Sequence, residues 1–481
     1  MPGTVTRTLR PDLRGEPRAV VNLHEAIAII VGIVIGAGIF KSPALVAGMA
    51  GSPGWMFAAW ALGGLVSLIG ALCYAELATT YPHVGGDYHF LHRAYGRSVS
   101  FLFAWARFSV ITTGSIALLA FVFGDYLSQV WPLGPRSPAL YAAAAIVVLT
   151  WVNLRGIKTS AGAQTWFTVL EVVGLLLIVV AGLSFLGDAT GASAATGDET
   201  ASAPSLRAFG MAMVFVLLTY GGWNEAVYIS AELKDERRNM VRALVISIIT
   251  ITALYLLVTW AYWRGLGLGG MAKSEAIAAD LLRVAFGDTS AVLIAIMVAI
   301  AALTSMNATM IVGARTSFAV GRDWPVLSRV GGWDELRGTP VAALLLQGAA
   351  ALLLVAIGAV VGGGFRSMVE FTAPVFWLFF LLTGLSVFVL RKREPHIERP
   401  FKVPLYPLLP LIFVLVCAYM LWSSLSYVYS QELGGLNAAW IGVAVLAIGG
   451  GLLLLVRGSG PPSHEAQPRA NRAGSSAAVE A

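Results

Sequence analysis

Charged residues are scarce in this chain of 481 residues. They make up 12% of it, whereas a soluble globular domain carries about 25%. Hydrophobic residues reach 57%, and the two figures together exclude a soluble globular protein and indicate an integral membrane protein. Cysteine is nearly missing as well: Cys73 and Cys417 are the only two, and both lie in apolar segments, so we expect no disulfide. The sequence also lacks a Walker motif, a His-Glu-x-x-His pair and a nucleophile elbow. We therefore expect no enzyme, no cofactor and no metal site.

What the chain does contain is twelve apolar segments, most of them reaching the ~20 residues that a helix needs to cross a bilayer. We therefore predict an all-α integral membrane protein with twelve transmembrane helices. The third and eighth segments are longer than a bilayer requires and are expected to tilt or to project from it. The segments cover about residues 23–49, 55–80, 98–130, 139–155, 163–187, 206–231, 241–265, 289–320, 339–361, 367–391, 404–428 and 437–457.

Lysine and arginine are distributed unevenly between the loops on the two sides. With the N-terminus inside, 24 of the 32 basic residues fall in inside segments, 7 in outside segments and one, Arg107, within a span. Because cytoplasmic loops carry an excess of these residues, we predict that both termini are cytoplasmic. The basic residues stand at loop ends and form no single patch, which argues against nucleic acid as a partner. Polar tails are expected at residues 1–21 and, in disordered form, at 458–481.

Glycines interrupt the first and sixth segments near their middle. Gly36, Ala37 and Gly38 lie in the first segment, and the run from Tyr220 to Asn224 lies in the sixth, each ~20 Å from the start of its segment. Glycine weakens a helix by about 1 kcal/mol relative to alanine. One interpretation is close packing of neighbouring helices. The other is a pair of broken helices in two halves of opposite topology, which marks a transporter's substrate site.

Broken helices would expose backbone groups at membrane depth. The freed N–H groups of Gly36, Ala37 and Gly38 would face an anion at the positive end of a half-helix, and the carbonyl group of Val34 would accept from an ammonium group. Together these groups would recognise the two ends of an α-amino acid.

Three sequence motifs resemble those of the amino acid–polyamine–organocation (APC) superfamily, and the second is most similar to the L-type amino acid transporters. They are the Gly-Ala-Gly-Ile-Phe run at 36–40, the Tyr-Gly-Gly-Trp-Asn run at 220–224, and the loop that contains Tyr74-Ala75-Glu76-Leu77, Tyr81-Pro82 and Gly85-Gly86-Asp87-Tyr88. The resemblance covers residues 22–457. It implies a LeuT-type fold with a 5+5 inverted repeat, at about 22–187 and 206–391, two extra helices at about 404–457, and alternating access.

The resemblance also assigns roles to individual residues. Gly36, Ala37 and Gly38 would bind the substrate carboxylate; the carbonyl groups of Val34 and Leu218, with Gly221, would hold the amine; and Gly222, Trp223 and Asn224 would complete the site. Leu218 departs from the L-type pattern, which has a gating aromatic residue there. This leaves open both the gate and the preference for large neutral substrates.

Two charged residues lie inside predicted spans. Arg107 is nine residues past the start of the third span and Glu171 eight past the start of the fifth, so both are ~12–14 Å deep. Charges at such depth are rare and are usually paired or functional. We consider a structural Arg107–Glu171 ion pair, and alternatively Glu171 as a site for a proton or another cation. In the L-type relatives a lysine usually stands at the position of Glu171.

Three further polar features have two possible interpretations each. Glu225 either faces water at the edge of the cavity or favours a cationic substrate or a proton. Asn307 either coordinates an ion or simply joins helices by a hydrogen bond. His83, His89 and His92 share a polar loop, where we favour a solvated or gating role over metal binding.

The sequence therefore predicts a secondary transporter of amino acids in the plasma membrane, or in the inner membrane of a bacterium, that works by alternating access without sodium. Its partners would be a small amino acid substrate and the lipid bilayer. The alternatives are a proton-coupled symporter of amines or cationic amino acids, an amino acid sensor that does not transport, and a channel. No exposed cysteine is evident for tethering a partner subunit.

Overall fold

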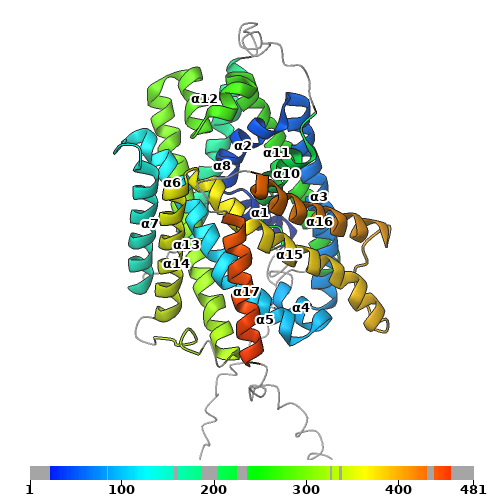
Figure 1. Ribbon diagram of the computed structural model, residues 1–481. Helices are drawn as coiled ribbons and strands as arrows, with labels where there is room; N and C mark the ends of the chain where they lie inside the picture. The colour runs from blue at the N-terminus through cyan, green and yellow to red at the C-terminus, as the bar shows by residue number, and fades with distance from the viewer. Residues whose placement is uncertain are drawn as a thin grey trace, which may run out of the picture.

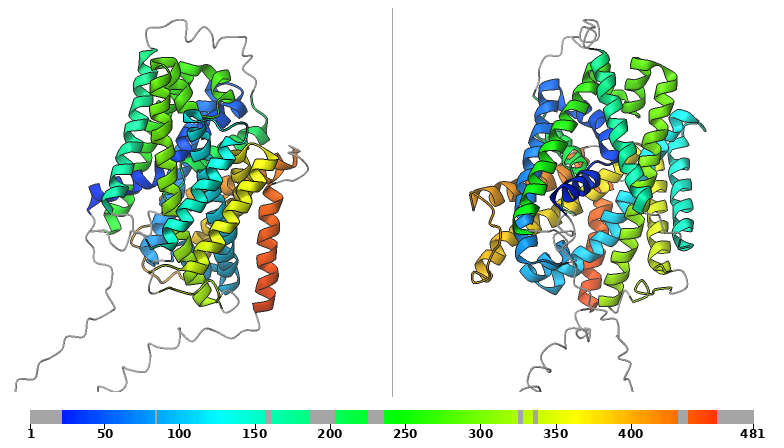
Figure 2. Two further views of the ribbon diagram at one scale, coloured as in Figure 1. Left: turned by 90° about the vertical axis from the view of Figure 1, so that its left-hand side faces the viewer. Right: turned by 180° about the vertical axis from the view of Figure 1, so that it is seen from behind.

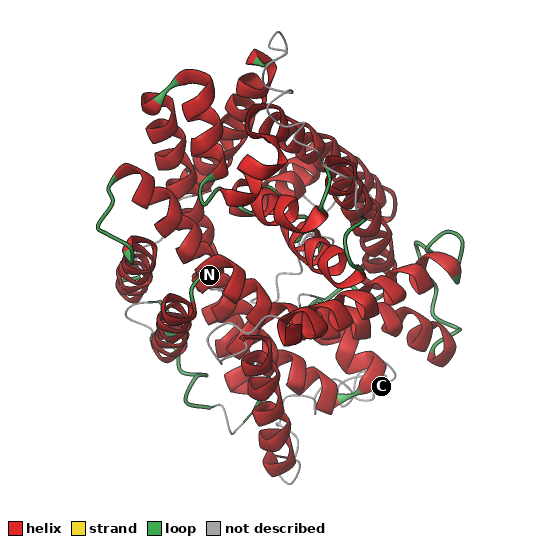
Figure 3. Cartoon of the chain, turned by 45° about the horizontal axis from the view of Figure 1, so that its top comes forward, coloured by secondary structure: helices red, strands yellow, loops and turns green. Residues whose placement is uncertain are grey.

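The structure, a computed structural model, describes residues 22–83, 85–156, 161–185, 203–224, 236–324, 328–334, 338–430 and 438–456. These residues form helices joined by loops (Figure 3). The helices are α1 (Leu23–Val34), η1 (Ala37–Phe40), α2 (Ser42–Ala50), α3 (Pro53–Thr80), α4 (Asp87–Tyr95), α5 (Arg97–Ala106), η2 (Arg107–Thr112), α6 (Thr113–Val130), α7 (Ser137–Leu154), α8 (Ala161–Ser184), α10 (Leu206–Thr219), α11 (Glu236–Lys273), α12 (Ile277–Phe286), α13 (Asp288–Asp323), α14 (Val341–Val361), α15 (Gly364–Arg393), α16 (Leu408–Ser430) and α17 (Ala438–Val456).

Eight of these helices are long and apolar enough to cross a membrane. They coincide with eight of the twelve predicted segments, and shorter apolar helices occupy the other four. The long third segment is confirmed as one run, α5–η2–α6, from Arg97 to Val130, and the long eighth segment as α13. The chain is a multi-pass membrane protein.

Capping residues explain where several helices begin. Ser52 precedes α3, and its Oγ accepts a hydrogen bond from the N–H of Trp55 (3.4 Å), next to a proline at the first helical position. Ser205 caps α10 in the same way through Ala208 (3.2 Å). The turn between α2 and α3 uses Gly51 at φ 71°, a left-handed conformation that glycine adopts without strain.

In Figure 1 and in the right-hand view of Figure 2 the first helix crosses the centre of the bundle, whereas the left-hand view of Figure 2 shows the start of α1 projecting from one side. Helix α11 packs directly against α1. Helices α6, α7, α13 and α14 pack together on one side. We call the top of Figure 1, where α12 lies, the α12 end, and the bottom, where α4 lies, the α4 end.

Candidate functional site

The first segment is broken at its glycines. Helix α1 ends at Val34, Ile35 and Gly36 are extended, and a short 3-10 helix starts at Ala37 before α2 begins. The amide groups of Gly36, Ala37 and Gly38 donate to no backbone carbonyl of the described residues outside their own helix. They begin a new helical stretch, where unpaired N–H groups attract anions.

The second break touches the first. Helix α10 ends at Thr219 and a turn runs to Asn224. Gly222 has φ 108°, and a Cβ there would lie only 3.0 Å from the carbonyl oxygen of Ile33. A side chain at this position would therefore push the two broken segments apart.

One hydroxyl group joins the two broken helix ends. The Tyr255 hydroxyl of α11 lies 3.0 Å from the carbonyl oxygen of Val34 and 3.2 Å from that of Thr219. Both carbonyl groups belong to the last residue of a helix, so the hydroxyl compensates for the hydrogen bonds that the breaks remove. Tyr255 is not among the sequence-predicted residues, because a tyrosine in an apolar segment carries no signal of such a role.

A cavity of about 470 Å³ opens beside the breaks. It reaches Gly32, Ile33 and Asn224 at the breaks and extends toward the α4 end, where Asp87 lies in its wall. Its lining residues are aromatic, apolar and hydroxyl-bearing, with two charged members: Gly32, Ile33, Tyr74, Asp87, Phe103, Arg107, Ile111, Thr112, Ser115, Asn224, Ser305, Ala308, Thr309, Val312, Gly313, Phe376, Phe379, Phe380 and Thr383. We call it the inner cavity. A large apolar wall with a few polar groups is typical of a small-molecule site.

Of the sequence-predicted residues, Asn224 and Arg107 line this cavity, whereas Val34, Gly36, Ala37, Gly38, Leu218, Gly221, Gly222 and Trp223 do not. The carbonyl group of Leu218 accepts a hydrogen bond from the N–H of Gly221 (3.0 Å) inside the turn. Trp223 packs edge-on against Tyr74, with ring centres 5.2 Å apart, and so holds the turn against α3. Glu225 lies outside the described residues.

The two charged residues of the third and fifth spans, Arg107 and Glu171, do not pair with each other. Arg107 starts the π-helical turn η2 and lines the inner cavity. Glu171 is 6% exposed, and its side chain has Ser305 of α13 as its hydrogen-bonding neighbour. The ion pair that their common depth predicts is not among the ion pairs of the described residues. Equal depth does not place two side chains on facing sides of their helices.

Asn307 joins two helices. Its Oδ1 accepts a hydrogen bond from Nδ2 of Asn153 on α7 (2.8 Å), which corresponds to the simpler of the two readings of this residue. Part of the predicted polar loop is helical, because His89 and His92 lie on α4. The ring of His83, which precedes α4, stacks on that of His89 with centres 4.2 Å apart. No group of three metal-binding side chains is found in the part of the chain that the structure describes.

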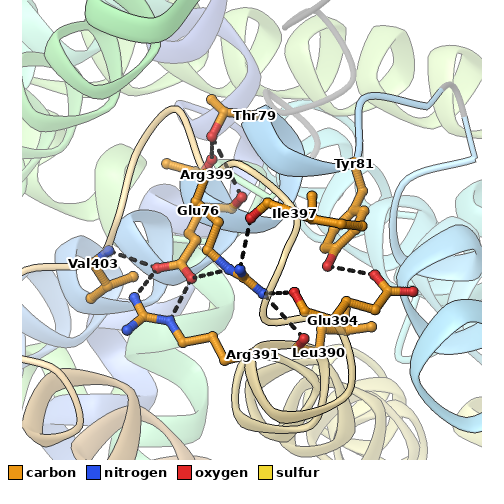
Figure 4. A network of polar contacts seen from close by, with 10 residues as sticks. Glu76, Thr79, Tyr81, Leu390, Arg391, Glu394, Ile397, Arg399 and Val403 are labelled. Atoms are coloured by element: carbon orange, nitrogen blue, oxygen red, sulfur yellow. Dashed lines mark hydrogen bonds and ion pairs between the residues drawn. The ribbon is translucent and has the colours of Figure 1, made fainter.

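Glu76 of the Tyr-Ala-Glu-Leu motif is the centre of a polar cluster at the α4 end (Figure 4). Its carboxylate accepts hydrogen bonds from Nε and Nη2 of Arg391 and from the N–H of Val403 (2.7 Å). A second cation, Arg399, lies 3.6 Å away. Beside it, Glu394 accepts from Tyr81 (2.8 Å) and Arg93 (2.9 Å). The motif therefore fastens α3 to the end of α15 and the loop that follows.

Comparisons with known proteins agree with this architecture. The family model for amino acid permeases matches residues 21–450. The b(0,+)-type amino acid transporter 1 of Mus musculus is 32% identical over 409 residues, which cover 83% of this chain and 81% of the relative. The Large neutral amino acids transporter small subunit 2 of Homo sapiens is 31% identical over 417 residues, which cover 84% of this chain and 75% of the relative. The chain belongs to the amino acid permease family of the APC superfamily.

Proposed function

We propose that this protein is a secondary transporter that moves an amino acid across the plasma membrane, or a bacterial inner membrane, by alternating access and without sodium. It catalyses no reaction. The observation that carries the proposal is the meeting of two broken helices beside a cavity: Gly222 against Ile33, and the Tyr255 hydroxyl group between Val34 and Thr219. Such a pair of breaks places unpaired backbone groups of both signs around one point.

The substrate's α-carboxylate would lie at the amide groups of Gly36, Ala37 and Gly38. Its ammonium group would lie at backbone carbonyl groups of the two helix ends. The carbonyl groups of Val34 and Thr219 already accept from Tyr255, and each retains a second lone pair. The substrate side chain would extend into the inner cavity, whose wall of Phe103 and the α15 aromatic residues favours an apolar or amphipathic side chain.

The orientation follows from charge. Arg93, Arg97 and the basic run Arg391–Arg393 all belong to the α4 end, so this end would face the cytoplasm. The inner cavity then opens to the cytoplasmic side and the α12 end faces outward. The first ten predicted spans, up to α15, would form two inverted repeats, with α16 and α17 added to them.

Uptake of labelled amino acids by purified protein in vesicles, in sodium-free buffer, tests the proposal. Gly38→Val is the informative variant, because a Cβ at Gly38 would already lie 3.3 Å from the Thr219 side chain. We expect it to accumulate normally and to lose substrate binding. The matched control is Gly269→Ala, where a Cβ meets nothing within 4 Å. Saturable binding without uptake would indicate a sensor, and unsaturable flux would indicate a channel.

Proton coupling is a second candidate, and Glu171 supports it. This carboxyl group is buried, contacts Ser305, and forms no ion pair with a described residue. It also lies close enough to Tyr255 to interact with it electrostatically, which brings it near the first break. A buried carboxylate without a counter-charge is costly, so binding of a proton or another cation there would be favourable.

The variant Glu171→Gln distinguishes a proton-coupling role of Glu171 from a purely structural role. If Glu171 carries the coupling proton, this variant folds and still binds substrate, but its uptake no longer responds to an imposed pH gradient. If the residue is structural, uptake responds to the gradient as in the wild type, whether that response is large or zero. Asn307→Ala serves as the control, because it removes a hydrogen bond to α7 without changing a charge.

A further inference from the structure

A second cavity, of about 580 Å³, lies at the α12 end, and we call it the outer cavity. The same segments line both cavities at different heights: the broken first helix, the run from α5 to α6, and α15. On the run from α5 to α6, Ser115 is the last residue to line the inner cavity and Phe121 the first to line the outer one. Six residues of helix, or ~9 Å, separate them. The protein between the two cavities therefore separates them, and we call this part of the protein the plug.

The charged part of this plug is centred on Lys41, directly after η1. Lys41 is 4% exposed, and its Nζ lies 2.7 Å from Oδ2 of Asp125 on α6 and 2.7 Å from Oε2 of Glu275. The side chain of Asp125 is 11% exposed and that of Glu275 81%. A buried ammonium group is stable only with partners, and Asp125 is the buried one.

Tyr126, the residue after Asp125, contacts the residue before Lys41. The Tyr126 hydroxyl group donates to the carbonyl oxygen of Phe40 (2.5 Å) and accepts from the N–H of Ala278 on α12 (3.3 Å). Two consecutive residues of α6 thus hold two consecutive residues of the broken helix. The segment around α12 completes the contact from a third direction.

The broken helix is tied to a different partner on its other side. The hydroxyl groups of Ser42 and Thr219 lie 2.7 Å apart, which joins the start of α2 to the end of α10. A movement of α2 together with α10, away from α6, would break the contacts of Lys41 and Tyr126 and leave the Ser42–Thr219 contact intact. Lys41 and Asp125 both line the outer cavity, so water there would hydrate them once they separate.

We propose that the Lys41–Asp125 ion pair, supported by Glu275 and Tyr126, is the gate that closes the substrate path at the α12 end. The proposal rests on the transport function above, because a gate has a role only in a path that alternates. In the present structure the gate is closed and the inner cavity is separated from the outer one. Opening it joins the two cavities, and the ion pair sets how often that happens.

Thiol labelling from the outside measures this opening. Both native cysteines are fully buried, so a single introduced cysteine gives a clean signal. Ser115→Cys places it in the inner cavity, just below the plug. In right-side-out vesicles, a membrane-impermeant maleimide should label this protein slowly. Lys41→Met in the same background should raise the labelling rate about tenfold, because it leaves Asp125 buried without its partner.

Two further variants decide the interpretation. The exchanged pair, Lys41→Asp with Asp125→Lys, should return the rate toward that of the parent. Arg264→Met is the control: it removes a cation of α11 that donates to the carbonyl oxygen of Phe185 (2.8 Å) and does not hold the broken helix, and it should leave the rate unchanged. Where Lys41→Met does not accumulate, Asp125→Asn replaces it and should raise the rate in the same direction.

The labelling rate tests the gate separately from the proposed transport function. If Lys41→Met left the labelling rate unchanged while the same cysteine was readily labelled in inside-out vesicles, the proposal that this ion pair is a gate would be wrong. An exchanged pair that labels as fast as the single variant would overturn the role of the ion pair. Labelling needs no substrate, so a failure of amino acid uptake would count against the proposed function alone.

Discussion

The two ends of the helix bundle each bury a charged residue between segments far apart in sequence, but they do so with different chemistry. At the α4 end, Glu76 accepts hydrogen bonds from a forked guanidinium group and from a backbone N–H, with Arg399 close by. At the α12 end, Lys41 offers one ammonium group on a flexible chain. The planar fork of arginine fixes both distance and angle, whereas an ammonium group acts as a point charge.

The two clusters also differ in what they join. The Glu76 cluster links α3 to α15 and the loop after it, and neither segment contains a break (Figure 4). The Lys41 cluster links the broken helix to α6. A rigid attachment therefore stands where two continuous helices meet, and a releasable one stands where a moving segment would meet a fixed one. This difference predicts that mutations at the α4 end change stability and that mutations at the α12 end change conformation.

Glu76→Leu should have the largest effect on stability. It leaves the Arg391 guanidinium group and the Val403 amide without their acceptor and removes the negative charge beside Arg399, a loss of about 3–5 kcal/mol. We expect a strong fall in the unfolding midpoint in detergent. The matched control is Glu394→Leu at the same end: its side chain is 24% exposed and bonded to Arg93, so the loss should stay below about 1 kcal/mol. Equal losses in the two variants would contradict the difference in burial on which this prediction depends.

Tyr126→Phe should have a smaller effect, of a different kind. It removes the hydroxyl group between Phe40 and Ala278 while keeping the ring, which weakens the closed gate by about 1 kcal/mol. We expect the outside labelling rate of Ser115→Cys to rise about fivefold, with little change in the unfolding midpoint. Tyr141→Phe is the control, because its hydroxyl group donates to the carbonyl group of the nearby Trp131 at the same end. A lower midpoint with no change in labelling would assign Tyr126 to stability and not to the gate.

The breaks in the first and sixth segments were predictable because their cause is local. Two glycines around one alanine weaken a helix wherever it lies, and the structure ends α1 at Val34 and α10 at Thr219. The long third and eighth segments were predictable for the same reason. Hydropathy and glycine spacing are properties of neighbouring residues.

The charge clusters were not predictable, because their members are distant in sequence. Glu76 and Arg391 are 315 residues apart, and nothing in either sequence neighbourhood indicates the other. Lys41 is one of the seven basic residues that the loop count assigns to outside segments, yet it is buried against Asp125. The depths of Arg107 and Glu171 were counted along their helices, but which neighbour a side chain meets depends on the rotation of its helix, which packing alone determines. Tyr255 was missed for this reason as well.

The smallest expected effect concerns pH at the α4 end. Burial, and then the neighbouring His83 and Arg93, lower the pKa of His89 to about 4. In the unfolded chain the pKa returns to about 6.5, so between these two values the unfolded state binds more protons than the folded state. Stability contributed by His89 is therefore fully present above pH 6.5 and is lost as pH falls toward 4.

His89→Phe keeps an aromatic ring against His83 and removes the titrating group. We expect its unfolding midpoint to fall less steeply than that of the wild type between about pH 7 and 4.5. Tyr95→Phe, which removes a hydroxyl group of the same helix α4 and no histidine, should leave the slope of the wild type unchanged. Parallel slopes for all three proteins would mean that His89 reaches water in the folded state and that the polar loop does not enclose it.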